Sequence, residues 1–113
     1  MAYYKLGVAY SQLGAWHAAK KAFSEALRLD PESTHAHFRH GLSLSNLSRH
    51  REAAESLRLA IWHDPALPDA HLALATTYQI LGEQDSAREQ LAIYKRLVRA
   101  SAPGQILTDP FRL

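Results

Sequence analysis

Histidines are the side chains of this sequence best suited to chemistry, because an imidazole can ligate a metal ion or exchange a proton near neutral pH. The chain has seven of them. His37 and His40 lie three residues apart, which a helix would place on one face, and His35 and His71 are further candidates for the same cluster. No cysteine is present, and the spacing shows no set of four tetrahedral zinc ligands. We therefore expect no metal ion and no cofactor.

The sequence motifs of catalysis are also missing. There is no glycine-rich phosphate loop, no His-Glu-x-x-His pair and no serine in a nucleophile-elbow context. The carboxylates are scattered, and pairs such as Glu55 and Arg58 have the spacing of ion pairs on the solvent face of a helix. We expect that the protein is not an enzyme.

Length, composition and charge favour one packed domain that binds neither nucleic acid nor membrane. The chain has 113 residues, of which 47% are hydrophobic and 21% charged, as is ordinary for a soluble globular domain. A net charge of +2 creates no strong field for nucleic acid, and no apolar run is long enough to span a bilayer. The opening MAYYKLGVAY lacks the pattern of a secretory signal. A chain without thiols suits either redox environment, so the compartment stays open, with the cytoplasm favoured.

The elements that must position any functional side chain are helices. Glycines and prolines fall at intervals typical of the breaks between helices, and apolar residues recur at helical spacing. In the first helix the apolar positions are Leu6, Tyr10 and Leu13. The pattern predicts three antiparallel helix pairs with breaks at Gly14, 30–31, Ser48, 64–65 and Gly82, and with a last helix that runs to about residue 100.

A repeat of 34 residues supports this division. ALRLDP at 26–31 returns as AIWHDP at 60–65. Small positions stay small and large positions stay large through the three copies, as in Ala19, Ala53 and Ala87, and in Phe23, Leu57 and Leu91. Two helices that pack at close distance need such small residues, and Gly7 and Gly41 are expected to serve the same purpose. His37 and His71 take the place of Tyr3, and His40 that of Leu6 and Leu74, so we interpret these histidines as packing residues; His40, if buried, should titrate below neutral pH.

The chain resembles the tetratricopeptide repeat family, whose pattern of Leu-Gly, Tyr, Ala, Phe and Pro is met in order by Leu6-Gly7, Tyr10, Ala19, Phe23 and Pro31. The resemblance implies an all-α fold in which three helix pairs stack as a right-handed α-solenoid. The repeats would span about 1–33, 34–67 and 68–100, followed by a tail at 101–113.

The third copy departs from the pattern in ways that indicate an end of the array. Tyr94 replaces the alanines of the first two copies, Ala26 and Ala60, and Arg99 replaces the proline of the break. The tail contains apolar Ile106, Leu107, Phe111 and Leu113 and is expected to pack beside Tyr94 as an irregular cap. The first helix has no capping residue before it, so we interpret the chain as the terminal part of a longer array.

The resemblance also implies where a partner binds. In the family, the first helix of each pair lines a concave groove that takes an extended peptide or a partner helix. The groove residues expected here are Tyr4, Val8, Ser11 and Gln12 in the first copy, Phe38, Leu42, Ser45 and Asn46 in the second, and Leu72, Thr76, Gln79 and Ile80 in the third. A related subgroup grips the C-terminal carboxylate of heat-shock chaperones with Lys, Asn and Arg on this face. The matching places are Tyr4, Val8, Arg39, Asp69 and Ala73, of which Arg39 alone could serve, so that mode of binding is disfavoured.

We therefore expect a non-catalytic protein–protein interaction module that binds an apolar peptide segment or partner helix. The alternative is a structural scaffold or self-assembling unit, a homo-oligomer without a separate ligand. Trp16 is expected in the core, and Trp62, which replaces arginines of the other copies, is expected to pack against its own surroundings.

Overall fold

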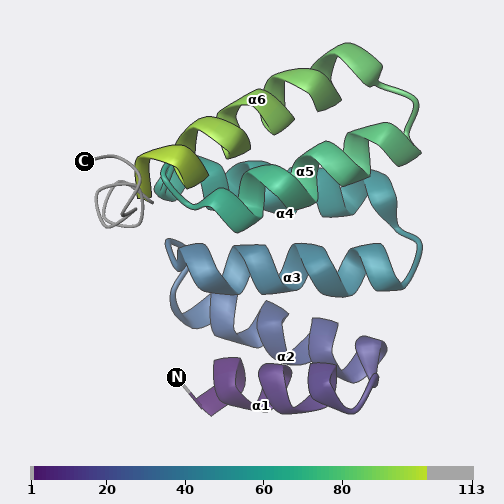
Figure 1. Ribbon diagram of the computed structural model, residues 1–113. Helices are drawn as coiled ribbons and strands as arrows, with labels where there is room; N and C mark the ends of the chain where they lie inside the picture. The colour runs from purple at the N-terminus through teal and green to yellow at the C-terminus, as the bar shows by residue number, and fades with distance from the viewer. Residues whose placement is uncertain (1, 102–113) are drawn as a thin grey trace, which may run out of the picture.

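The computed structural model describes residues 2–101, and this part of the chain consists of helices joined by short turns (Figure 1). Their bounds are α1 Ala2–Gln12, α2 Trp16–Leu29, α3 Thr34–Asn46, α4 His50–His63, α5 Pro68–Ile80 and α6 Gln84–Ser101. These bounds confirm the helices and breaks that the sequence pattern predicts, and α6 extends slightly beyond the expected end. None of the helices in the described range is both long and apolar enough to cross a membrane.

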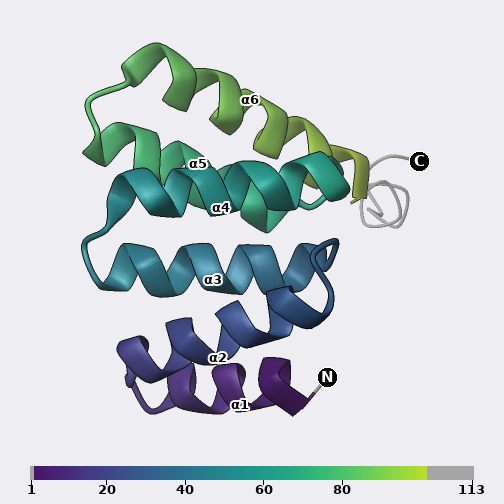
Figure 2. The same cartoon turned by 180° about the vertical axis from the view of Figure 1, so that it is seen from behind.

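Consecutive helices form antiparallel pairs, and the pairs stack in one direction as a helical-repeat solenoid. α1, α3 and α5 lie on one side of the stack (Figure 1), and α2 and α4 come to the front when the molecule is turned (Figure 2). The overall dimensions are 52 × 33 × 25 Å. The radius of gyration is 15.8 Å, against about 13 Å for a compact domain of about 100 residues. The molecule is therefore elongated, and each pair packs mainly on its neighbours in sequence.

The turn inside each pair has the same backbone geometry. Gly14, Ser48 and Gly82 have φ angles of 72°, 61° and 80°, the left-handed region. The residue after each turn donates its N–H to the carbonyl five residues earlier, as from Arg49 to Leu44 at 2.9 Å. Glycine meets this requirement without strain in two copies, and Ser48 meets it as a larger residue in the third.

The helices within a pair touch at the predicted small residues. A Cβ atom added to Gly7 would lie 2.5 Å from the Phe23 ring, and one added to Gly41 would lie 2.9 Å from Leu57. Ala19 and Ala53 are fully buried and Ala87 nearly so. These contacts confirm the close approach expected of the small positions.

Contacts between pairs build the rest of the core. Ala54 and Leu57 of α4 cluster with Leu74 and Tyr78 of α5, and Ala87 of α6 joins them. The helix starts are fixed locally: the Ser33 hydroxyl accepts a bond from the Ala36 N–H at 3.2 Å, and Pro68 occupies the first turn of α5. Burial of this cluster joins the second pair to the third.

Three expectations differ from the structure or fall outside it. Leu6 and Leu13 follow the helical apolar spacing, yet they are 42% and 80% exposed because no helix covers that face of α1. The prediction that Trp62 packs locally is wrong: its side chain is 79% exposed on α4. The expected cap, residues 105–113, lies outside the described residues, and Tyr94 is half-buried. The division into repeats at 1–33, 34–67 and 68–100 stays a prediction.

Candidate functional site

An apolar hollow of about 440 Å³ lies between α3 and α5. The groove residues that line it are Phe38, Leu42, Ser45, Asn46, Leu72, Thr76 and Ile80. Leu72 and Ile80 are 38% and 56% exposed, which is unusual for aliphatic side chains in a packed domain. The hollow thus brings together first helices of the second and third pairs.

The groove residues of the first pair do not reach this hollow. Tyr4 packs inside its own pair, with its ring centroid 5.8 Å from that of Phe23, and it lines a separate hollow of about 140 Å³ with residues of α2 and α3. Val8, Ser11 and Gln12 line neither of these two hollows, and Gln79 is exposed on α5 outside them. The continuous groove expected along three repeats is therefore represented by a hollow in two of them.

Four further residues line the larger hollow, and sequence reasoning did not assign them to the groove. They are His50, Asp69, Ala73 and Thr77. His50 begins α4 immediately after the left-handed turn, so its position depends on the return of the chain between helices. Asp69 and Ala73 are placed one turn apart on α5 and could have been found from the same 34-residue register.

The polar side chains around the hollow use their donors within their own helices. The Thr76 hydroxyl donates to the Leu72 carbonyl at 3.1 Å, and the Asn46 amide donates to the Leu42 carbonyl at 2.9 Å. The Thr77 hydroxyl donates to Ala73 at 2.8 Å. Oxygen lone pairs are left for a ligand, since each hydroxyl has one proton. Together with the exposed Asp69 carboxylate, the lining offers acceptors for partner donors.

Histidines do more than fill gaps between helices. The His37 Nε2–H donates to the Pro31 carbonyl at 2.7 Å, and the His71 Nε2–H donates to the Pro65 carbonyl at 2.8 Å. Both rings are buried, so they pack as expected. Each bond also ties the start of a first helix to the break before it. The spacing from Pro to His, repeated after 34 residues, was the signal for this role.

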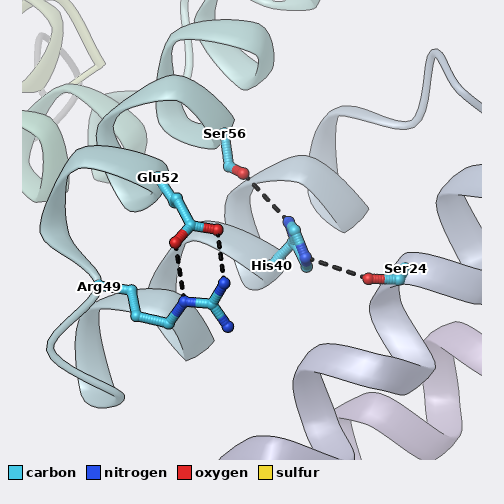
Figure 3. A network of polar contacts seen from close by, with 5 residues as sticks. All are labelled: Ser24, His40, Arg49, Glu52 and Ser56. Atoms are coloured by element: carbon cyan, nitrogen blue, oxygen red, sulfur yellow. Dashed lines mark hydrogen bonds and ion pairs between the residues drawn. The ribbon is translucent and has the colours of Figure 1, made fainter.

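His40 joins three helices through its ring nitrogens (Figure 3). Its Nδ1 lies 3.0 Å from the Ser56 hydroxyl of α4, and its Nε2 lies 3.2 Å from the Ser24 hydroxyl of α2. Burial of the ring lowers the pKa of His40 below its ordinary value, and the nearby His37 and Lys20 lower it further. This direction confirms the titration expected for a buried His40, while the two hydrogen bonds make it a polar bridge as well as a packing residue.

Arg49 and Glu52 lie beside this bridge at the start of α4. The guanidinium makes two bonds to the carboxylate, both 2.8 Å long (Figure 3). Within residues 2–101, no group of three or more His, Cys, Asp or Glu side chains has the arrangement of a metal site. The polar network therefore serves the joint between helices.

Comparison with known proteins identifies the repeat. Residues 1–33 match the model of the tetratricopeptide repeat family. Among solved structures, the crystal structure of MamA is 24% identical with a TM-score of 0.86 over 90% of this chain and 60% of MamA. A second MamA structure (MSR-1, C2) is 27% identical with a TM-score of 0.83 over 88% of this chain and 57% of its own. The chain thus spans about 60% of the MamA chains.

A further neighbour was solved with a ligand. The second tetratricopeptide repeat domain of Spaghetti (RPAP3), bound to the HSP90 peptide SRMEEVD, is 16% identical with a TM-score of 0.83. The match covers 85% of this chain and 89% of that domain. At this identity the likeness establishes the fold.

Proposed function

Because this chain belongs to the tetratricopeptide repeat family, we propose that it binds an apolar segment of a partner protein in the hollow between α3 and α5, without catalysing a reaction. The observation that carries the proposal is the exposed aliphatic lining contributed by Leu42, Leu72 and Ile80. Aliphatic side chains gathered in a concave surface bind a partner by removing apolar area from water. Peptide binding by the RPAP3 domain supports the same kind of function for this fold.

The chemistry of the rim favours a partner that carries hydrogen-bond donors. Thr76 and Asn46 present oxygens whose own protons or amide hydrogens are engaged within the helices. Asp69 adds an exposed carboxylate to the lining. A basic side chain or a free backbone N–H next to an aliphatic residue satisfies both features.

The same rim disfavours an acidic ligand such as the peptide SRMEEVD held by the RPAP3 domain. A second carboxylate brought next to Asp69 would meet like charge in a partly desolvated hollow. Leu42 and Leu72 supply no positive charge to offset the repulsion. We expect aliphatic and basic residues, and not acidic ones, to dominate the ligands of this hollow.

Selection of peptides displayed on phage, followed by measurement of Kd for the selected peptides, tests the proposal. Leu72→Ala should raise Kd by about 5- to 100-fold, because a central aliphatic anchor carries a large share of affinity. Leu59→Ala is the matched control, since Leu59 is an exposed leucine on α4 that does not line the hollow. Equal loss of affinity in both variants, or selected sequences rich in Asp and Glu, would contradict the proposal.

A further inference from the structure

The face of α1 that points away from the rest of the molecule is apolar and uncovered. Figure 1 shows α1 at the end of the stack, and Figure 2 agrees from behind. Tyr3, Leu6 and Leu13 are 40%, 42% and 80% exposed, and Tyr10 completes the row along the helix. We call these four residues the α1 stripe. It lies at the opposite end of the described chain from α6 and outside the hollow between α3 and α5.

The internal repeat shows what covers the corresponding faces. After 34 and 68 residues the stripe recurs as His37, His40, Leu44 and Leu47 on α3, and as His71, Leu74, Tyr78 and Leu81 on α5. All eight of these side chains are buried or half-buried. α3 packs against α2, and α5 packs against α4. In both cases the second helix of the preceding pair covers the stripe.

The joint between α4 and α5 defines the covering helix chemically. Ala54, Leu57 and Ile61 form the uncharged face of α4 that packs on Leu74 and Tyr78. Small and aliphatic residues on one helix therefore accept large residues on the other.

Polar atoms at the edges of this joint fix its register. Arg58 Nη1 donates to the Tyr78 hydroxyl at 3.0 Å, and the Pro65 carbonyl beyond the end of α4 accepts from His71. In α1, Tyr10 has the same hydroxyl as Tyr78, and Tyr3 offers a hydroxyl donor where His71 offers an N–H. The α1 stripe thus carries both the apolar and the polar groups of a joint between repeats.

A second copy of this chain fits the stripe poorly. The register places Arg88 and Lys95 of α6 where α4 has Ala54 and Ile61, and both charged residues are exposed. Docking α6 on the stripe would remove these charges from water without a partner carboxylate. Docking α1 on α1 would set tyrosines and leucines against one another instead of against small residues.

We propose that the α1 stripe is an open joint between repeats, and that it binds the second helix of a helical hairpin from a partner protein. That helix carries a small and aliphatic packing face like the Ala54, Leu57 and Ile61 face of α4. It ends in a turn whose backbone carbonyl reaches Tyr3. This surface is separate from the proposed peptide site, so either can fail in experiment without the other.

The test supplies such a helix by fusion, because a single isolated helix is only marginally stable in water. A copy of residues 34–68 placed directly before Met1 keeps the 34-residue register and sets an α4 helix beside α1. We expect hydrogen exchange of the α1 amides to slow by about tenfold or more and Tm to rise by about 5 °C or more.

The matched control is the same fusion with Ala54→Lys and Ile61→Lys in the added copy alone, which imitates the charged face of α6. It should lose the protection of α1. Equal exchange of α1 in the two fusions would overturn the proposal. So would a dimer of the unfused chain, measured by light scattering, that Leu6→Lys converts to monomer, since a second copy would then cover the stripe.

Discussion

At the scale of single residues, the histidines show how a packing position acquires a polar role. His40 occupies the place of Leu6 and Leu74 in the other copies, yet its ring nitrogens face hydroxyls on α2 and α4. The sequence could predict that the side chain fills a gap between helices. It could not predict the hydrogen bonds, because Ser24 and Ser56 come from helices whose relative rotation depends on the stacking of pairs.

Acidification should weaken the fold through His40. Its folded pKa lies below the ordinary value because of burial, then His37 and Lys20, with Arg49 acting in the same sense and Glu52 opposing. Protons therefore bind the unfolded chain more readily, and the stability present above the ordinary histidine pKa, about 6.5, is lost as pH falls through that value toward the folded pKa.

Urea unfolding at about pH 7.5 and about pH 5.5 measures the effect, since the two conditions bracket the ordinary pKa of histidine. His40→Leu, which copies Leu6 and Leu74, should reduce the loss of unfolding free energy between the two conditions. His17→Leu, at an exposed histidine on α2, is the control that should keep the wild-type loss. An unchanged pH dependence in His40→Leu would show that other groups are responsible.

At the scale of elements, sequence reasoning succeeded where a residue type has one physical use. The breaks at Gly14 and Gly82 follow from backbone freedom, and the α5 start at Pro68 follows from the proline ring. It failed for Leu6 and Leu13, because spacing identifies an apolar face but not whether another helix covers it. The hollow between α3 and α5 was predicted in part for the same reason: Leu42 and Leu72 share a register, whereas Tyr4 is drawn into its own pair.

The contact of α1 with α2 should tolerate no added methyl group at Gly7. Gly7→Ala would place a Cβ 2.5 Å from the Phe23 ring, and we expect a loss of about 1–3 kcal/mol in unfolding free energy. Phe23→Leu copies Leu57 and Leu91 and makes room at the same place. The double variant should therefore cost less than the sum of the two single changes, as measured by a double-mutant cycle in urea. Additive losses would show that Gly7 and Phe23 are not coupled.

At the scale of the whole molecule, a stack of pairs has ends and a middle. Gly7 is the buried residue of α1 and Ala87 that of α6, whereas α5 buries six residues between its neighbours. In such a quasi-one-dimensional array each pair is stabilised mainly by those beside it. The ends should therefore open more often than the middle.

Native-state hydrogen exchange should show this gradient. We expect amides of α1 and α6 to exchange through low-energy local opening, and those of α3, α4 and α5 to exchange most slowly. Equal protection across all six helices would indicate that the stack unfolds as one cooperative unit.

The ion pairs have a consequence for experiments on this protein. The pairs identified in the described range, Arg28–Glu25, Arg49–Glu52 and Arg88–Asp85, each join residues of one helix or of one helix and its cap, and none connects two repeats. Ions that screen exposed charges thus act within single helices and leave the joints between them nearly unaffected. We expect Tm to change by no more than about 2 °C between low and moderate concentrations of sodium chloride. A ligand affinity that falls steeply over the same range would then report on the ligand and Asp69, because the receptor itself is indifferent to ionic strength.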